Sequence, residues 1–293
     1  MTGFMIPSPE LRARVALEKH GFHNTHSLGQ NFLLDEGMLT GLLDRIALYA
    51  TDNVIEIGPG AGVMTRLMAE RTRRVCALEL DRDLEPVLAD VLSGIDNAEV
   101  VFEDAMKADI AALARNRFSG EPWRVVANLP YYITADILIR LATLDDAPES
   151  ISIMVQKEAA ERIMSTPGTK AWCAMAATVQ SYGAAEVVAD VGPEAFDPPP
   201  HVMSQFIRIS RHEVPVVAPK DGRIYLRLIQ AAFAMRRKTL ANNLKAAFGL
   251  SGEASAALLE RAGLDARVRG EALTLEELCR VADALAEAVA SPR

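Results

Sequence analysis

The stretch VIEIGPGAG, residues 54–62, indicates how the first two thirds of the chain fold. A run rich in β-branched residues leads straight into glycines at three alternate positions. Glycine lets the backbone turn sharply and approach a ligand closely, and a helix that starts after such a turn faces the ligand with its N-terminus. Glycine-rich turns also follow strands in proteins that bind no nucleotide, so this stretch by itself leaves both readings open.

Strand-like and helix-like segments alternate around this stretch, from about residue 51 to residue 153. Strands are expected at 53–57, 74–80, 99–102, 123–127 and 150–155. Helices are expected between them, at 65–70, 84–92 and 134–144. This alternation is typical of a parallel sheet with crossover helices, so we predict a Rossmann-like α/β domain. A later strand at 205–209 should join the sheet in the antiparallel direction.

The remainder of the chain is expected to be helical. Residues 211–222 carry two prolines and no periodicity, which is typical of a linker. One continuous helix is predicted from Tyr225 to Phe248, and Thr274 with Glu277 forms a capping box for a last helix. We therefore predict an N-terminal extension helix in residues 1–26, an α/β domain in 27–212 and a small all-α domain in 213–293.

The N-terminal extension is interpreted as an amphipathic helix. Ser8 and Pro9 start it, and Leu11, Val15 and Leu17 supply its apolar positions. No continuous apolar core follows the charged residues, so a signal peptide is not indicated.

Composition narrows the class of protein. The chain has 293 residues, of which 50% are hydrophobic and 24% charged, so it can bury the cores of about two domains. Cys76, Cys173 and Cys279 are too few and too far apart for a disulfide framework or a zinc ribbon. No apolar run approaches the ~18 residues that a membrane span needs. We expect a cytoplasmic protein with reduced thiols and no metal.

Acidic residues lie at the ends of the second and third predicted strands. Glu79 lies 21 residues after Gly58 (79 − 58), where nucleotide-binding α/β folds place a carboxylate that accepts both ribose hydroxyls. We prefer Glu79 to the nearby Asp81 for this role. Asp104 follows the third strand and is placed to accept a bond from an adenine amino group. An exposed acid or a helix cap is the plainer interpretation of Asp104.

The fourth predicted strand ends in NLPYY, residues 128–132. The exocyclic amine of adenine is a weak nucleophile because its lone pair is delocalised into the ring. The Asn128 carbonyl, with a backbone carbonyl that Pro130 frees from regular pairing, can accept both amine hydrogens, and a neighbouring aromatic ring can stack on an extruded base. The motif favours methylation of an adenine amine, and a proline-containing loop with two core tyrosines is the alternative.

Taken in order, these motifs resemble those of the small-subunit ribosomal RNA adenine dimethylases, over nearly the whole chain from about Ser27 to Leu285. The matching stretches are LGQNFL at 28–33 with Asp35, EIGPGAG at 56–62, ELD at 79–81, Asp104, NLPYY at 128–132, QKE at 156–158 with Arg162, F-x-P-x-P-x-V-x-S at 196–204, and RRK at 236–238 with NNL at 242–244. The resemblance implies S-adenosylmethionine as the methyl donor.

The resemblance also implies roles for particular residues. The donor-binding residues would be Asn31 and Leu33 at the methionine end, Gly58 at the first turn, Glu79 on the ribose, Asp104 on the adenine, and Asn128 between donor and target. The catalytic residues would be Asn128, Leu129, Pro130, Tyr131 and Phe196, with Tyr131 and Phe196 on either side of the target adenine. We expect direct methyl transfer without a strong general base, since Asn128 and backbone carbonyls orient and polarise the amine.

The substrate is likewise implied by the resemblance. Two adjacent adenosines near the 3′ end of the 16S ribosomal RNA would each receive two methyl groups, in an immature 30S particle. The protein would act as a monomer and contribute to biogenesis of the small subunit. Two departures from the family pattern lie at residues 23–26 (HNTH), where basic residues are usual, and at Trp172–Cys173, where a Tyr-Gly pair is common. The first leaves an N-terminal RNA contact in question.

The net charge of −8 argues, as a single number, against a nucleic-acid partner. Residues 205–250 nevertheless hold nine Lys and Arg against two acids, so phosphate contact should concentrate there. The expected RNA-binding residues are Arg236, Arg237 and Lys238. On the predicted continuous helix Arg237 fills a gap in the apolar stripe and bridges to the α/β domain or to RNA phosphate. A solvated charge run is the alternative.

Other functions remain open. A resistance-type large-subunit ribosomal RNA adenine methyltransferase would share the chemistry, although the RRK and NNL stretches favour the small-subunit family. A DNA adenine methylase would carry an acid-Pro-Pro motif that this sequence lacks, and a dehydrogenase would have the glycine spacing G-x-G-x-x-G. A ribosome-assembly factor whose methylation is secondary is compatible with the same sequence.

Overall fold

The computed structural model of the chain describes residues 7–22 and 31–290. These residues form two compact units. Unit 1 comprises the described residues up to Ala160 together with Ala185–Arg211, and unit 2 comprises Glu161–Ala184 and the described residues from His212 onward. One crossing between the units, at Arg211 and His212, lies beside the boundary expected from the sequence. The inclusion of Glu161–Ala184 in unit 2 was not expected.

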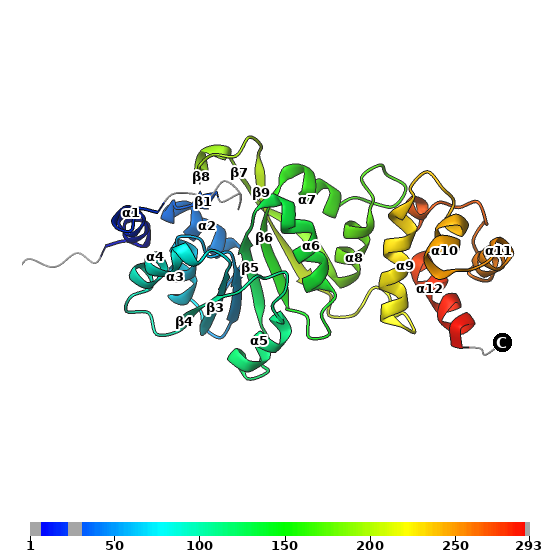
Figure 1. Cartoon of the computed structure of the whole chain (residues 1–293), viewed down its shortest axis with the longest axis horizontal. Helices are drawn as coiled ribbons and strands as arrows, with labels where there is room; N and C mark the ends of the chain where they lie inside the picture. The colour runs from blue at the N-terminus through cyan, green and yellow to red at the C-terminus, as the bar shows by residue number, and fades with distance from the viewer. Residues whose placement is uncertain (1–6, 23–30, 291–293) are drawn as a thin grey trace, which may run out of the picture. The chain divides into compact units, whose positions relative to one another are not determined.

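The helices and strands follow the order shown in Figure 1. The strands are β1 (Phe32–Leu33), β2 (Asn53–Ile57), β3 (Arg74–Glu79), β4 (Ala98–Phe102), β5 (Arg124–Asn128), β6 (Ser150–Gln156), β7 (Gly183–Val191), β8 (Phe196–Asp197) and β9 (Ser204–Arg211). The α-helices are α1 (Pro9–Lys19), α2 (Glu36–Arg45), α3 (Val63–Ala69), α4 (Glu85–Val91), α5 (Ile110–Phe118), α6 (Tyr131–Ala142), α7 (Lys157–Ile163), α8 (Ala174–Tyr182), α9 (Gly222–Ala234), α10 (Leu240–Phe248), α11 (Gly252–Arg261) and α12 (Leu275–Ala290). Short 3-10 helices are η2 (Arg82–Leu84), η3 (Pro193–Ala195) and η4 (Gly270–Ala272).

The central sheet of unit 1 has seven strands in the order β4-β3-β2-β5-β6-β9-β7. β2 pairs in parallel with β3 on one side and β5 on the other, and β9 runs antiparallel to β6, with Ile207 opposite Ile153. The predicted parallel sheet with an antiparallel addition is confirmed. In such a sheet the order reverses between β2 and β5, and a ligand crevice forms outside the carboxyl ends of the strands at that point.

The three alternate glycines turn the chain after β2. Gly58, Gly60 and Gly62 have φ angles of +75°, +55° and +80°, which side chains rarely tolerate. A Cβ on Gly60 would lie 2.9 Å from the Phe32 ring, and one on Gly62 would lie 2.9 Å from a methyl group of Leu88. The glycines therefore allow close packing of protein against the turn as well as a close approach of ligand.

Unit 2 is built around its own apolar core, drawn from α8 to α12 and the segment before α8. Trp172 is fully buried in this core, donates its indole N–H to the carbonyl of Leu273 at 3.1 Å, and meets Phe233 edge to face. This anchor explains why Glu161–Ala184 packs with the helical region. The predicted capping box is confirmed, since Thr274 and Glu277 exchange hydrogen bonds of 3.0 and 3.2 Å.

The prediction of one continuous helix from Tyr225 to Phe248 is wrong. α9 ends at Ala234 and α10 begins at Leu240, whose amide donates to the carbonyl of Val268 at 2.7 Å and not to the preceding turn. Both helices bury apolar residues. The helical spacing of these residues continues from one helix to the next, so the sequence pattern does not reveal the loop between them. The RRK stretch lies in that loop.

The apolar face predicted for the N-terminal helix is wrong at two of its three positions. Ser8 does cap α1, Pro9 starts it and Leu17 packs partly buried against the core, but Leu11 and Val15 are 51% and 53% exposed. The buried residues include Ala13 and Ala16, because small side chains let α1 pack closely on α3 and α4. Residues 23–26, where an RNA contact was in question, lie outside the described residues.

Candidate active site

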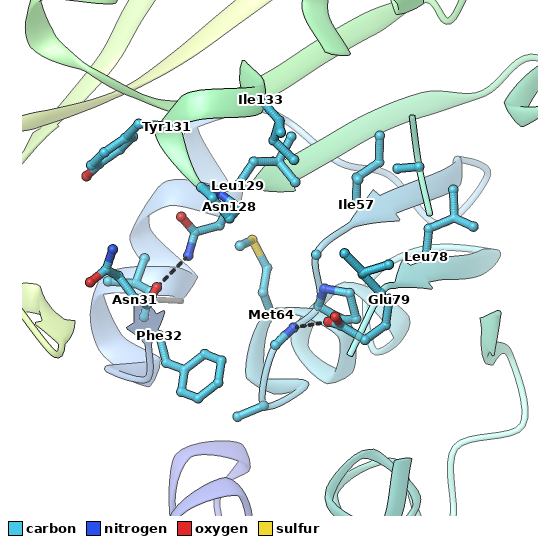
Figure 2. Close-up of a pocket in the computed structure, with 18 of the residues that line it drawn as sticks. Asn31, Phe32, Ile57, Met64, Leu78, Glu79, Asn128, Leu129, Tyr131 and Ile133 are labelled. Atoms are coloured by element: carbon cyan, nitrogen blue, oxygen red, sulfur yellow. Dashed lines mark hydrogen bonds between the residues drawn. The ribbon is translucent and has the colours of Figure 1, made fainter. Parts of the chain in front are cut away.

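A pocket opens at the carboxyl ends of β2, β3 and β5, at the reversal of strand order. Every donor-binding and catalytic residue predicted from the sequence lines it, as Figure 2 shows for several of them. These residues are Asn31, Leu33, Gly58, Glu79, Asp104, Asn128, Leu129, Pro130, Tyr131 and Phe196. The tertiary structure thus collects in one cavity residues that span positions 31 to 196 of the chain. Their roles in binding and catalysis stay predictions.

Glu79 ends β3 and closes one side of the pocket. Its Oε2 accepts a bond from the amide of Gly60 at 3.2 Å, drawn as a dashed line in Figure 2, and its Oε1 accepts one from the amide of Asp81 at 2.8 Å. The side chain is therefore held between the glycine turn and the end of its own strand. Burial raises the pKa of this carboxyl, while the backbone N–H groups of Asp81 and Gly60 oppose the shift. Asp81 caps η2 by accepting from Asp83, and it does not line the pocket.

Asp104 follows β4 and has two local partners. Its Oδ1 accepts a bond from the amide of Met106 at 2.9 Å, and its Oδ2 lies 3.2 Å from the ammonium of Lys107. The Met106 amide is the main cause that lowers the pKa of this carboxyl. Asp104 is half-buried and forms a turn, whereas the cap of α5 is Asp109, so Asp104 is neither the exposed acid nor the helix cap of the plainer interpretation. It also lines the pocket.

Asn128 ends β5, and its orientation comes from a residue far away in sequence. The side-chain amide of Asn128 donates to the backbone carbonyl of Asn31 at 3.4 Å, shown in Figure 2. Because the NH2 group is engaged there, the side-chain oxygen faces away from Asn31. That oxygen is the acceptor which methylation of an adenine amine requires. The sequence motifs point to both residues but not to the bond between them.

Two further contacts involve Phe196 and Tyr131, the residues expected on either side of the target adenine. β1 pairs antiparallel with β8, which places Leu33 opposite Phe196. The hydroxyls of Tyr131 and Ser204 share a hydrogen bond of 2.6 Å, and Ser204 is fully buried. Ser204 was missed as a site residue, and its only sequence signal was its place at the end of the F-x-P-x-P-x-V-x-S pattern.

Tyr131 and its neighbour open a helix and do not lie in a loop. α6 begins at Tyr131, three residues earlier than expected (134 − 131), with Pro130 as the residue before its first turn. Proline is well suited to this place because it lacks the N–H that a helix start leaves unpaired. Burial raises the pKa of the Tyr131 hydroxyl. Phe196 is only 5% exposed, and its predicted contact with a target base stays a prediction.

Glu56 is a buried acid beneath the glycine turn. It is the one acid of β2, it is fully buried, and neither of its carboxylate oxygens has a hydrogen-bond partner among the described residues. Burial raises the pKa of Glu56 to about 8, against the opposing effect of the neighbouring Thr65 hydroxyl. A buried carboxyl without a strong partner avoids the cost of a buried charge by staying protonated.

The predicted RNA-binding residues lie together in the loop between α9 and α10, but they differ in their contacts. Arg236 reaches the carboxylate of Glu271 at 3.2 Å and the carbonyl of Lys170 at 2.7 Å, so it supports neighbouring loops of unit 2. Arg237 and Lys238 are exposed. Because the continuous helix does not exist, Arg237 has no position in an apolar stripe, and the bridge to the α/β domain that rested on this position has no basis. Contact between Arg237 and RNA phosphate stays a prediction.

The basic segment 205–250 is not one patch. Arg208 belongs to unit 1, where it pairs with Glu186 at 2.5 Å. Within unit 2, Lys220 pairs with Glu287 at 2.5 Å and Arg236 pairs with Glu271. These acids lie outside residues 205–250. A count of charges restricted to this segment therefore overstates the positive charge at its surface.

The lining of the pocket fits an adenosine-containing donor. The pocket and the open space at its mouth together enclose about 1060 Å³. The pocket combines apolar walls from Ile57, Leu78 and Leu80 with the carboxylates of Glu79 and Asp104.

Among residues 7–22 and 31–290, no group of three or more His, Cys, Asp or Glu side chains is placed to hold a metal ion. In the same part of the chain, every helix is too short or too polar to span a bilayer.

The chain is similar to known proteins over most of its length. The family of ribosomal RNA adenine dimethylases matches residues 21–287. A protein named ribosomal RNA small subunit methyltransferase A from Streptococcus pneumoniae (strain P1031) is 44% identical over 276 residues, which cover 93% of this chain and 95% of that protein. A protein of the same name from Streptococcus sanguinis (strain SK36) is 43% identical over the same shares.

Solved structures show the same fold. A dimethyladenosine transferase from Plasmodium falciparum superimposes with a TM-score of 0.68 at 21% identity, over 84% of this chain and 94% of that one. The 23S rRNA methyltransferase ErmE gives a TM-score of 0.61 at 25% identity, over 87% of this chain and all of the other. With the family match spanning both units and identity above 40% to curated relatives, the chain belongs to the ribosomal RNA adenine dimethylase family.

Proposed function

We propose that the protein, acting as a monomer, uses S-adenosylmethionine to dimethylate the 6-amino groups of two adjacent adenosines near the 3′ end of 16S ribosomal RNA in an immature small subunit. One observation carries the chemistry. The amide of Asn128 is held by Asn31 so that its oxygen is presented in the pocket that also contains Glu79. The names of the relatives that are 43–44% identical support the small-subunit RNA as substrate.

The pocket residues divide into a donor side and a target side. On the donor side Glu79 accepts from the ribose hydroxyls and Asp104 accepts from the adenine amine, while Gly58 lets the backbone come close. Asn31 and Leu33 hold the methionine end. When bound, S-adenosylmethionine supplies a methyl group on a positively charged sulfur.

On the target side, the residues hold and polarise the adenine amine. The Asn128 oxygen accepts one amine hydrogen and the backbone carbonyl of Leu129 accepts the other, since the Pro130 carbonyl already accepts from Ile133 and Thr134. These two bonds keep the nitrogen lone pair from delocalising fully into the ring. Tyr131, steadied by Ser204, stacks on the base together with Phe196. No residue has to remove a proton before the transfer, since orientation and hydrogen bonding supply the rate enhancement.

Phosphate contacts come from unit 2. Arg237 and Lys238 are exposed on the loop between α9 and α10 and reach RNA phosphate directly. Arg236 holds the loop through Glu271 and Lys170. The acidic remainder of the chain limits indiscriminate attraction to RNA.

The large-subunit alternative has weaker support. The 23S rRNA methyltransferase ErmE is 25% identical to this chain, well below the 44% of the small-subunit relative. An assembly role does not compete with catalysis, because a protein can bind immature particles and methylate them.

The test is transfer of radiolabelled methyl groups to small subunits from cells that lack this modification, followed by mapping of the modified nucleotides. Dimethylated adenosines at two adjacent positions near the 3′ end are expected, and large subunits serve as the matched control. Labelling of large subunits in place of small ones would overturn the proposal.

Asn128→Ala separates binding from chemistry. We expect it to bind S-adenosylhomocysteine measurably, because Glu79 and Asp104 remain, but to transfer no methyl groups. Turnover near the wild-type rate would contradict the proposed site. Cosedimentation of this variant with immature small subunits reports the assembly role independently of catalysis.

A further inference from the structure

The loop between β4 and α5 turns tightly around Asp104. The backbone carbonyl of Asp104 accepts bonds from the amides of Lys107 and Ala108 at 2.8 and 2.9 Å, and its side chain accepts from Met106. These bonds occupy the amide groups of Met106, Lys107 and Ala108. The carbonyls of Ala105 and Met106 point out of the turn and need donors from another element.

Arg140, near the end of α6, supplies those donors. Its Nη1 donates to the carbonyl of Ala105 at 3.2 Å and to that of Met106, and its Nη2 donates to the carbonyl of Ala108 at 2.5 Å. The side chain is half-buried. A guanidinium carries five N–H donors in one rigid plane, so it can hold several carbonyls at fixed relative positions, which a lysine ammonium cannot do.

The loop that Arg140 holds belongs to the pocket. Asp104 and Ala105 both line it, on the side where the proposed function places the adenine of the donor. The Arg140 charge also helps, after the Met106 amide and Lys107, to lower the pKa of Asp104. An ionised carboxylate accepts a hydrogen bond from an adenine amine more strongly than a neutral one does.

The other end of α6 begins the target side. The helix runs from Tyr131 to Ala142 without interruption, so Tyr131 and Arg140 sit on one rigid element. Arg140, near one end of α6, therefore holds the loop between β4 and α5. The first turn at the other end carries Tyr131, which contacts the target base in the proposed function.

We propose that Arg140 is a positioning residue that holds the Asp104 loop against α6 and thereby sets how strongly the pocket recognises the amino group of the donor's adenine. The inference rests on the proposed function, in which Asp104 accepts from that amino group. Arg140 itself is not a catalytic residue, because it acts through the loop.

The experiment compares two ligands that differ only at the amine. S-adenosylhomocysteine carries the 6-amino group, and its 6-deamino analogue, the purine-riboside form, carries hydrogen there and keeps an unprotonated N1. Calorimetric titration of the full chain should show a preference of about tenfold or more for the adenosyl ligand in the wild type, the value of one hydrogen bond to a charged acceptor. In Arg140→Lys and Arg140→Gln the preference should fall to about threefold or less, because the carboxylate is no longer held in place.

Arg66→Lys is the matched control. Arg66 also donates to two backbone carbonyls, those of Val91 and Ser93 at 2.8 and 3.1 Å, but its side chain does not line the pocket. We expect its substitution to lower stability, yet to leave the preference between the two ligands at the wild-type value. A general loss of stability would weaken both ligands together and leave their ratio unchanged.

Asp104→Ala distinguishes failure of this inference from failure of the proposed site. If Asp104→Ala loses the preference while both Arg140 variants keep it, Arg140 has no positioning role and the donor site stands. If Asp104→Ala keeps the preference, or the wild type has none, the assignment of Asp104 to the donor adenine is wrong and the inference falls with it. Arg140→Lys keeps the positive charge, so it serves as the decisive variant should Arg140→Gln fail to fold.

Discussion

Substitution of Glu79 by glutamine tests the donor side of the site most directly. Both carboxylate oxygens of Glu79 already accept backbone N–H groups, from Asp81 at 2.8 Å and from Gly60 at 3.2 Å. Glutamine replaces one oxygen by an NH2 group. In either orientation of the amide, this NH2 group faces a backbone N–H, so one hydrogen bond to the backbone is lost. The side chain also has one acceptor fewer for the ribose hydroxyls.

The structure sets the size of the expected effect. Glu79 is 6% exposed, so water cannot take the place of a missing acceptor. A hydrogen bond to a charged group contributes about 1.5–3 kcal/mol, which corresponds to a 10- to 150-fold change in the dissociation constant. We expect Glu79→Gln to weaken binding of S-adenosylhomocysteine by about that factor. Because burial raises the pKa of Glu79, the neutral amide also relieves a desolvation cost, which limits any loss of thermal stability.

Calorimetric titration of S-adenosylhomocysteine into the two proteins measures this factor, and Asp81→Asn is the matched control. Asp81 accepts from the amide of Asp83 at 3.0 Å as the cap of η2, and asparagine caps equally well. The control should keep wild-type affinity, because Asp81 does not line the pocket. Wild-type affinity in Glu79→Gln, or an equal loss in Asp81→Asn, would refute the assignment of the ribose to Glu79.

Two further predictions concern a buried acid and the exposed cations. The folded-state pKa of Glu56, about 8, lies above its ordinary 4.5, so the folded protein holds a proton that the unfolded chain releases, and stability is lost as pH rises through this window, at up to about 1.4 kcal/mol per unit. Urea unfolding of Glu56→Gln should lack this slope, and a slope equal to that of the wild type would contradict the buried neutral carboxyl. Replacing both Arg237 and Lys238 by glutamine should reduce the slope of log affinity for ribosomal RNA against log salt by about 0.7–0.9 for each phosphate that the variant no longer neutralises. Lys220→Gln, at a residue already paired with Glu287, is the control, and a double variant with an unchanged slope would exclude phosphate contact by this loop.

Much of the fold could be read from local patterns. β2 lies where the run before the glycine turn predicted it, because the β-branched residues Val54, Ile55 and Ile57 favour a strand. The capping box at Thr274 and Glu277 was equally local. The break between α9 and α10 was not visible, since two helices that bury the same kind of face on one core continue each other's periodicity. The exposure of Leu11 and Val15 was missed because close packing of α1 favours alanine over larger apolar residues.

For the site, the sequence by itself determined which chemical groups are present and in what order: the glycine turn, the acids after β3 and β4, and NLPYY after β5. Strand ends in a parallel sheet meet at one edge, so even their convergence was predictable. Only the tertiary structure decided how the groups are held. Asn128 is oriented by a carbonyl 97 residues away, Tyr131 by a hydroxyl 73 residues away, and Trp172 by a carbonyl 101 residues away. Contacts between residues so far apart leave no periodic trace in the chain, because periodicity records only which face of its own element a residue occupies.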